Sequence, residues 1–454
     1  MSSTALKALP GSIGLIKNIQ GIRKYGFLQF INELWTTHGD LFQIKLGSRL
    51  LVIPVHPEAV RHITITHRQN YDKLESYEPT RRYLLGNGLL TSIGEPWRMQ
   101  RKLMAPFYTP RGVQAYAEIM MRDGRRLLQR WEKLADQNEP VAMDEEMTIV
   151  TAQIILKAMF SMETDDEIVS MKDSVETMIG YQSTRQSMPI PIPTWLPTQR
   201  NLRYRAARDQ VHGYINGVIG QRRAMSEDQW PQDLLTKLMM VRNEETGTPL
   251  SESLLRDEAI TTFFAGHETT ARLLTFTWYA LSSHPEVMAT LQAELDRVLG
   301  SREATLEDLH HLPYTLQVIK EALRLYPPAP FYVRDAIESD VIDGYTIPET
   351  ASMMLSPYYT HRHPEFWADP LKFDPDRWTP EKEAAMHPSA YHPFSSGQRV
   401  CIGNNFSLLE SHILLALLAQ KFTPRLQAGH EPQWIMQGTL GVKNGMPMTI
   451  ERRR

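Results

Sequence analysis

The N-terminal part of the chain contains two short segments rich in strand-forming residues, Leu41–Leu46 and Leu50–Val55. They flank the turn-forming residues Gly47-Ser48-Arg49. This arrangement predicts a β-hairpin.

The apolar residues recur at helical spacing from about Pro110 to Leu299. The longest candidate there is Arg256–Ser283, which at about 1.5 Å per residue would span about 40 Å. His284-Pro285 stops it, because the residue before a proline disfavours helical geometry. Further predicted helices are Thr148–Met162, Arg200–Arg222, Leu312–Tyr326 and Ile402–Lys421.

Non-helical segments interrupt and follow this pattern. Met188–Pro197 holds four prolines in ten residues and is predicted to be a loop. Val341–Ile347 and Ala351–Leu355 are predicted to be short strands, and Asp369–Pro380 to be extended. Short strands and turns are expected near the C-terminus.

These patterns predict a mainly α fold with a small β-rich part. No stretch has the composition of a flexible linker, so we expect one large domain over residues 1–454. Its mixed, β-rich part lies at about 30–70, and its helical core at about 90–454.

Composition and charge exclude several classes of protein. With 42% hydrophobic and 22% charged residues the chain is neither disordered nor fibrous. The net charge of −3 argues against a nucleic-acid partner. The single cysteine, Cys401, excludes intrachain disulfides and zinc sites built from several thiolates, and favours a reducing compartment, the cytoplasm.

No run of 18 apolar residues is present, so no integral membrane segment is predicted. Residues 13–31 nevertheless mix apolar and basic side chains. Such a helix either lies on a membrane surface or packs on its own domain, and we expect the second.

The cysteine lies in Phe394-Ser-Ser-Gly-Gln-Arg-Val-Cys-Ile-Gly403, directly before a predicted helix. Amides at a helix N-terminus stabilise a sulfur anion, and Gly397 and Gly403 let the backbone approach a flat group. Arg399 is able to pair with an anion. Spacing alone leaves three interpretations: a thiolate ligand of haem iron, a buried inert cysteine, or a nucleophile served by a histidine such as His392.

A second group lies in the middle of the long predicted helix, in Ala265-Gly-His-Glu-Thr-Thr270. Gly266 costs about 1 kcal/mol relative to Ala in a helix interior, and the Thr269 hydroxyl can bond a carbonyl one turn back. Gly266 and Thr269 would together open a groove for a diatomic molecule, with Glu268 as a possible proton source. The alternative is an ordinary helix in which these residues have no such role.

A third group is the acid–base pair Glu321 and Arg324, which share one helical face. Pro327-Pro328 follows closely, which places the pair near the buried end of a helix. Arg377, in Phe373-Asp-Pro-Asp-Arg-Trp378, is expected to complete a charge network.

With these residues assembled, the chain resembles the cytochrome P450 family, the haem-thiolate monooxygenases, over nearly its whole length. The family's Phe-x-x-Gly-x-Arg-x-Cys-x-Gly signature is matched at every fixed position by Phe394, Gly397, Arg399, Cys401 and Gly403. Three further motifs match in the family's order: Trp97 with Arg101, Ala265-Gly266 with Glu268-Thr269, and Glu321 with Arg324.

The resemblance implies haem b as cofactor and O2 as cosubstrate. It implies that Cys401 is the thiolate ligand of the iron and that Phe394 shields the sulfur. Glu268 and Thr269 would be catalytic, delivering protons during oxygen activation. The haem propionates would be held by Arg101, Arg334, Arg399 and the Trp97 indole, with Ala265 and Gly403 completing the haem contacts and with Glu321, Arg324 and Arg377 as a structural triad.

The implied reaction inserts one oxygen atom of O2 into a hydrophobic substrate of the fatty acid, terpenoid or steroid type. The spelling Ala-Gly-His-Glu-Thr-Thr resembles that of some fatty-acid hydroxylases, but no arginine stands out as a carboxylate anchor. By position, the resemblance implies an apolar pocket that includes Phe263, Phe264, Ala265, Ala329, Phe331, Val333 and Leu440.

Electrons are expected from a separate partner, a ferredoxin or flavodoxin with its reductase, docking on the side of the cysteine loop. Two alternatives stay open on the same fold. One is a peroxygenase driven by hydrogen peroxide, against which Glu268 and Thr269 speak. The other is a non-catalytic haem sensor or carrier.

Overall fold

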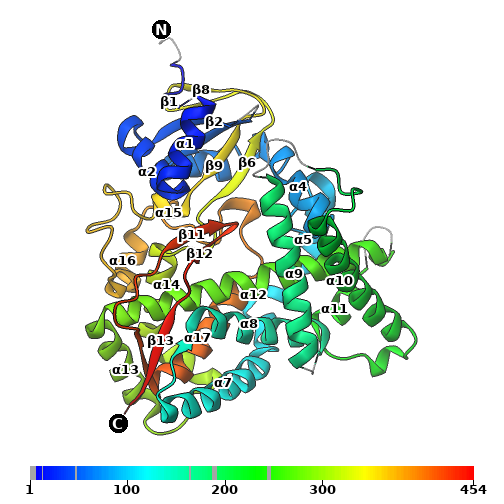
Figure 1. The fold of residues 1–454 in the computed structure, drawn as a ribbon, viewed down its shortest axis with the longest axis vertical. Helices are drawn as coiled ribbons and strands as arrows, with labels where there is room; N and C mark the ends of the chain where they lie inside the picture. The colour runs from blue at the N-terminus through cyan, green and yellow to red at the C-terminus, as the bar shows by residue number, and fades with distance from the viewer. Residues whose placement is uncertain are drawn as a thin grey trace. The chain divides into compact units, whose positions relative to one another are not determined.

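The computed structural model describes residues 7–12, 14–46, 49–162, 165–186, 192–242 and 247–453. Its contacts divide the chain into two compact units, each assembled from separate stretches of sequence. Unit 1 comprises Met1–Ser76, Gln317–Cys401 and Gln433–Lys443. Unit 2 comprises Tyr77–Leu316, Ile402–Pro432 and Asn444–Arg454. Figure 1 shows that the chain is mainly helical with small sheets, as predicted.

Unit 1 is built on a sheet in the order β1-β2-β3-β9-β6-β4. The predicted hairpin is confirmed: β2 and β3 are antiparallel, with Leu41 opposite Pro54, although Gly47 and Ser48 lie outside the described residues. The strands of this sheet are β1 (Gly11–Ser12), β2 (Leu41–Leu46), β3 (Arg49–Pro54), β4 (Tyr71–Asp72), β6 (Tyr332–Ala336) and β9 (Ser352–Leu355).

Helices and two further hairpins complete unit 1. The last residue of η3 and the first turn of α14 belong to unit 2. The helices are α1 (Leu15–Tyr25), α2 (Phe27–His38), α3 (Pro57–Arg61), η1 (His62–Thr66), η2 (Arg68–Asn70), η3 (Glu75–Tyr77), α14 (Pro313–Leu325), α15 (Pro357–Thr360), η8 (Pro375–Trp378), α16 (Pro380–Ala385) and η9 (Gly397–Arg399), and the hairpins pair β7 (Asp340–Ile342) with β8 (Tyr345–Ile347) and β11 (Trp434–Gln437) with β12 (Thr439–Val442).

Two local predictions in unit 1 need correction. Val341–Ile347 is a hairpin, because Asp343 and Gly344 adopt φ angles of 51° and 78° and so form the tight turn that Asp-Gly favours. Asp369–Pro380 is not extended throughout, because the Asp374 side chain accepts a hydrogen bond from the Asp376 amide and starts the short helix η8.

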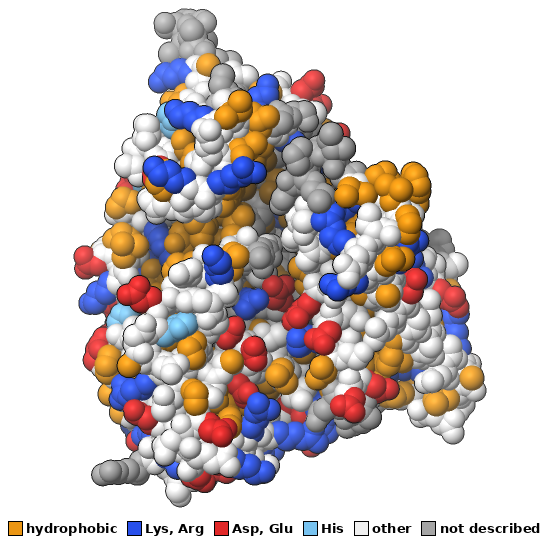
Figure 2. All heavy atoms as spheres, viewed as in Figure 1, with side chains coloured by type: hydrophobic (Ala, Val, Ile, Leu, Met, Phe, Trp, Pro, Cys, Tyr) orange, Lys and Arg blue, Asp and Glu red, His pale blue; other side chains and the backbone are white. Residues whose placement is uncertain are grey.

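The N-terminal helix α1 bears on the question of membrane contact. Ile22 packs against the core of unit 1, while Leu15, Ile16 and Ile19 are 44%, 72% and 38% exposed. Figure 2 shows hydrophobic and basic side chains intermingled over this part of the surface. The packing interpretation therefore accounts for one face of α1 only. Among the described helices, none is long and apolar enough to cross a membrane.

Unit 2 is mainly helical, with a small sheet in the order β10-β13-β5. Its strands are β5 (Val141–Ala142), β10 (Phe422–Leu426) and β13 (Pro447–Arg452). Its helices are α4 (Glu78–Thr80), η4 (Arg81–Leu85), α5 (Gly94–Met104), η5 (Ala105–Tyr108), α6 (Pro110–Gln114), α7 (Ala117–Gln137), α8 (Met143–Phe160), α9 (Asp165–Gln186), α10 (Gln199–Arg223), η6 (Glu227–Gln229), α11 (Leu234–Met240), α12 (Glu252–Ser283), α13 (Pro285–Leu299), η7 (Leu306–His311) and α17 (Asn404–Ala419).

The central helix of unit 2 is α12, which ends before His284-Pro285 as predicted. The Ser251 hydroxyl accepts a hydrogen bond from the Leu254 amide and caps its start. The predicted proline-rich loop Met188–Pro197 lies partly outside the described residues, and its remainder, from residue 192, is non-helical as expected.

Candidate functional site

Cys401 lies at the end of a tight loop in unit 1 and is exposed. Its backbone N–H donates a 2.8 Å hydrogen bond to the Phe394 carbonyl, which closes the loop around η9. An exposed thiol does not fit the interpretation as a buried inert cysteine. His392 does not fit as its base either, because burial lowers the pKa of the imidazole to about 3 and its Nδ1 lies 3.2 Å from the Tyr332 hydroxyl.

Gly397 is required by the backbone of this loop. Its φ is +66°, and a Cβ atom there would lie 1.9 Å from the carbonyl oxygen of Thr64 in η1. Ser395 shares the left-handed conformation at a φ of 65°, and its hydroxyl accepts a 3.1 Å hydrogen bond from Arg334. The loop is thus held against η1 and tied to β6.

A cluster of buried basic side chains lies in the same unit. Arg334 and Arg399 are both at least nine-tenths buried, and Arg399 forms an ion pair with Asp72. Lys73 follows Asp72 and is also buried. Burial, and then the charges of Arg334 and Arg399, hold the pKa of the Lys73 ammonium well below its usual range.

Lys73 was not among the residues predicted from the sequence. It becomes visible only through strand pairing, because β4 lies antiparallel to β6 with Asp72 opposite Asp335. No motif near Lys73 signals this position. Two arginines and a buried lysine near an exposed thiol fit the cysteine-ligated haem of the predicted family, since its two propionate carboxylates would be stabilised by basic side chains.

The predicted triad forms a network in unit 1 in which Glu321 and Arg324 are fully buried and Arg377 is partly exposed. Arg324 donates to both carboxylate oxygens of Glu321 at 2.8 Å, and Arg377 lies 3.4 Å from Glu321. The remaining guanidinium N–H groups of Arg324 donate hydrogen bonds to the backbone carbonyls of residues 361, 370 and 372. Glu321 therefore faces two guanidinium groups, and backbone carbonyls accept the other Arg324 hydrogens, which ties α14 to residues 361–377.

Two histidines link this network to the cysteine loop. His361 Nδ1 lies 3.2 Å from the Arg324 carbonyl, and the His392 amide donates to His361 Nε2 at 2.9 Å. Burial keeps the pKa of His361 well below its usual range, so its ring is neutral and one nitrogen can accept. A continuous path of hydrogen bonds therefore runs from Glu321 to the residues that precede Phe394.

In unit 2, the middle of α12 carries a partly exposed stripe beside buried residues such as Phe263 and His267. The stripe comprises Phe264, Ala265, Glu268 and Thr269, which helical spacing places on one face. Glu268 lies 3.8 Å from Arg272, and the Thr269 hydroxyl donates to the Ala265 carbonyl at 2.7 Å. An apolar section thus adjoins an acid and a hydroxyl.

Gly266 does not open the groove on its own side of the helix. A Cβ atom there would lie 2.9 Å from Ile155 of α8, so the missing side chain allows α8 and α12 to pack closely. The Thr151 hydroxyl also donates to the His267 carbonyl at 3.0 Å. Phe263 is buried on this packed side, where its ring stacks on His267 at 4.7 Å.

The other predicted residues are placed as follows. Trp97 and Arg101 lie four residues apart on α5 in unit 2, with Trp97 buried and Arg101 partly exposed. In unit 1 the Leu440 amide donates to the Pro328 carbonyl at 2.9 Å, beside Ala329. Phe331 and Val333 pack partly into the core of unit 1, where the Phe331 ring meets Phe27 at 5.5 Å.

Comparisons with known proteins agree with this architecture. The family model described as Cytochrome P450 matches residues 9–449. "Cyclooctatin synthase" of Streptomyces melanosporofaciens is 34% identical over 88% of this chain and 85% of that protein. "Cyclooctat-9-en-7-ol 5-monooxygenase" of the same organism is 32% identical over 92% and 89%. The crystal structure of the cytochrome P450DA heme domain covers 99% of both chains at 27% identity and a TM-score of 0.88. The chain therefore belongs to the cytochrome P450 family and is an oxidoreductase that incorporates oxygen.

Proposed function

We propose that the protein is a haem-dependent monooxygenase that hydroxylates a cyclic terpenoid and receives electrons from a separate protein. The observation that carries the proposal is the stripe on α12. Phe264 and Ala265 provide an apolar surface, and Glu268 and Thr269 provide an acid and a hydroxyl on the same face. Hydrophobic substrate binding and proton delivery are thereby combined on one helix.

The residues of unit 1 suit the haem in charge and in access. Cys401 would be the iron ligand, and Lys73, Arg334 and Arg399 would bind the propionates, together with Trp97 and Arg101 of α5. When bound, the haem supplies the thiolate-ligated iron at which O2 is activated. Phe394 and Gly403 flank the ligand in the sequence. The hydrogen bond from the Cys401 amide to the Phe394 carbonyl fixes the position from which the sulfur would approach the iron.

Thr269 and Glu268 would transfer protons to the site of oxygen activation. In this structure the Thr269 Oγ1–H donates to Ala265, so its oxygen is available as an acceptor. A proton passed from the Glu268 carboxyl group through water to Thr269 Oγ1 would let the hydroxyl donate in turn. The presence of this acid and hydroxyl pair supports turnover driven by O2 over turnover driven by hydrogen peroxide, which does not require such proton delivery.

The substrate class rests on the relatives' names and on the apolar lining. One relative is named for cyclooctatin and the other for cyclooctat-9-en-7-ol, a cyclic alcohol. Phe264, Ala265, Ala329, Phe331, Val333 and Leu440 remain the proposed pocket, whereas Phe263 is packed against His267 on the other side of α12. A ferredoxin or flavodoxin with its reductase is the proposed electron source, and the cytoplasm the proposed location.

The test has two stages. The purified protein is first reduced and exposed to carbon monoxide, alongside Cys401→Ala. We expect a strongly red-shifted Soret band that the variant loses. Cyclooctat-9-en-7-ol and a straight-chain fatty acid of similar carbon number are then titrated while the spin state of the iron is followed. A spin shift at lower concentration for the cyclic alcohol supports the proposal.

Two outcomes contradict it. A Soret band that is the same in the wild type and in Cys401→Ala would refute the ligand assignment. A spin shift with the fatty acid at lower concentration than with any cyclic terpenoid would refute the substrate class while leaving the enzyme class intact.

A further inference from the structure

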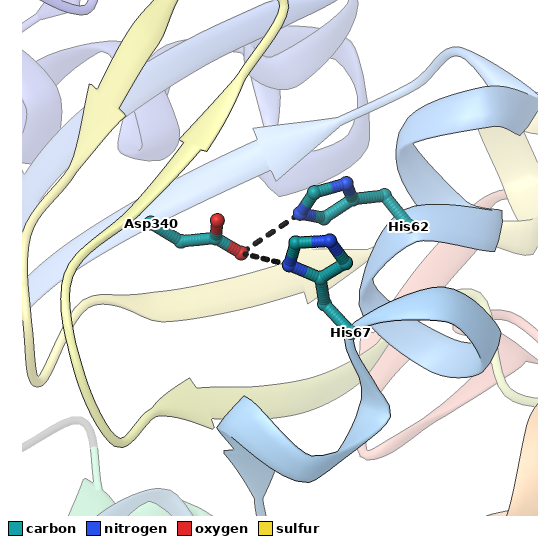
Figure 3. A group of neighbouring side chains, drawn as sticks. All are labelled: His62, His67 and Asp340. Atoms are coloured by element: carbon teal, nitrogen blue, oxygen red, sulfur yellow. Dashed lines mark hydrogen bonds and ion pairs between the residues drawn. The ribbon is translucent and has the colours of Figure 1, made fainter.

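A second group of possible metal ligands lies in unit 1, outside the cysteine loop and the cationic cluster. One nitrogen of His62, one nitrogen of His67 and one oxygen of Asp340 all lie within 4.8 Å of one another. Figure 3 shows the two imidazole rings directed at the same carboxylate oxygen. Asp340 Oδ2 is 2.8 Å from His62 Nε2 and 3.5 Å from His67 Nδ1.

The π-helical turn η1 brings the two histidines together. The His67 amide donates to the His62 carbonyl at 2.8 Å, five residues back, so the two residues lie above one another. Their rings stack with centroids 4.0 Å apart. In an α-helix, residues five apart point in different directions, and the pair would be separated.

Asp340 is held in place by groups that are not needed as ligands. The Tyr71 hydroxyl donates to Asp340 Oδ2 at 2.7 Å, and the Val341 amide donates to Oδ1 at 2.7 Å. Burial opposes ionisation of this carboxyl group, but hydrogen bonds from His62 and Tyr71 outweigh it and lower the pKa. Supporting hydrogen bonds of this kind orient the carboxylates and histidines of metal sites.

The group is accessible to a hydrated ion. The His67 side chain is 52% exposed, that of His62 is 21% exposed, and that of Asp340 is 10% exposed. A cavity of about 180 Å³ opens beside it, with His62, Thr66, Val341 and Asp343 among its lining residues. An ion can therefore reach the carboxylate from the solvent without unfolding of the hairpin.

We propose that His62, His67 and Asp340 form a binding site for a divalent transition-metal ion of the zinc type. Two imidazole nitrogens and one carboxylate oxygen are a ligand set that Zn²⁺ accepts, with water in the remaining position. Ligand distances of about 2.0–2.2 Å place neighbouring ligand atoms of a tetrahedral ion about 3.3 Å apart. The His67–Asp340 separation is already close to this value, and His62 must withdraw slightly from Asp340.

The stacked rings also require one side chain to turn. A shared ion must lie close to the plane of each imidazole, and two stacked rings whose planes differ by only 28° offer no such point nearby. His67 is the ring with the freedom to rotate, because half of its side chain is exposed. The π turn fixes the histidine backbones, so only side-chain torsions need to change.

The experiment measures Zn²⁺ binding to tag-free holoprotein from which adventitious metal has been removed with a chelator. Isothermal titration calorimetry gives the stoichiometry and the affinity, and thermal unfolding with and without Zn²⁺ gives a second readout. We expect one Zn²⁺ per chain and a higher melting temperature in its presence. His67→Ala and Asp340→Asn should each weaken binding at least tenfold.

His310→Ala is the matched control, because His310 and His311 are also neighbouring surface histidines, with ring centroids 3.7 Å apart. It should bind Zn²⁺ as the wild type does. If Asp340→Asn fails to fold through loss of its structural hydrogen bonds, His67→Ala decides alone, since its ring is half exposed. The proposal is overturned if the wild type binds no Zn²⁺, or if His67→Ala binds it with unchanged affinity.

Discussion

The hydroxyl of Thr269 donates a 2.7 Å hydrogen bond to the carbonyl of Ala265, one turn earlier in α12. The neighbouring Thr270 points elsewhere, and its hydroxyl donates to Ser407 of α17 at 3.0 Å. Two adjacent threonines therefore have separate partners, which makes their roles distinguishable by mutation.

Thr269→Ala should divert electrons from product to hydrogen peroxide, because the hydroxyl that would carry the proton is lost. General acid–base groups contribute about 10²–10⁴-fold, and we expect the low end because water can partly replace a hydroxyl. The measurement is product formed per electron consumed. Thr269→Ser should restore coupling, and Thr270→Val should leave it unchanged. Equal coupling in Thr269→Ala and the wild type would remove Thr269 from the mechanism.

Lys73→Met should release haem faster than the wild type. Hydrogen bonds to charged groups are worth about 1.5–3 kcal/mol, which corresponds to roughly 10–100-fold in the rate of haem loss. Transfer of haem to an excess of a haem-binding protein gives this rate. Lys45→Met, at an exposed position of β2, is the matched control. Unchanged haem loss in Lys73→Met would show that the cluster does not bind the propionates.

Glu258→Gln should make stability less dependent on pH. Burial raises the pKa of the Glu258 carboxyl group to about 8, from its ordinary value of 4.5. The folded state therefore takes up a proton between these values, and stability falls as pH rises from about 4.5 to about 8.

The slope of this loss is at most about 1.4 kcal/mol per pH unit. Glutamine keeps an acceptor for the Leu89 amide, which lies 3.0 Å from the Glu258 carboxylate, and does not titrate. Urea unfolding at pH 6, 7, 8 and 9 measures the free energy of unfolding. The difference between variant and wild type should shift in favour of the variant as the pH rises to about 8, and then level off. A parallel pH dependence in both proteins would mean that Glu258 ionises normally.

Gly266→Ala should destabilise unit 2 by about 1–3 kcal/mol, despite the higher helix propensity of alanine. Its new methyl group would lie 2.9 Å from Ile155 Cγ1. The double variant with Ile155→Ala should recover part of this loss, because the clash is with a side chain. Chemical denaturation of both single variants and the double variant gives the coupling energy. Strict additivity would show that the two residues do not meet.

The spacing of apolar residues predicted those helices and strands that bury a regular apolar face and whose ends are marked in the sequence. The hairpin of β2 and β3 and the end of α12 are of this kind, because a turn sequence and His284-Pro285 mark them. The start of α12 was missed, because the helix begins at Glu252, before the predicted Arg256. The hairpin of β7 and β8 was missed although Asp343-Gly344 carries a turn signal. The short helix η8 was missed because proline-rich sequence is compatible with both extended and 3-10 geometry.

The candidate site was predictable where its residues are neighbours in the sequence. Cys401, Arg399 and Gly397 share one loop, and Glu268 and Thr269 share one helix. Lys73 was not predictable, because the charges around it come from β6 and η9, more than 250 residues further along the chain. The same holds for Asp340, whose partners His62 and His67 are brought together by a π turn that no sequence pattern specified.

Gly397 and Gly266 differ in how a substitution can be repaired. At Gly266 the obstacle is the Ile155 side chain, which a second mutation can shorten. At Gly397 the obstacle is the Thr64 carbonyl, which every amino acid carries. A mutant library aimed at new substrates can therefore include substitutions of Gly266 when Ile155 is shortened in the same variant. Gly397 should be left out of such a library, because no second mutation removes the obstacle.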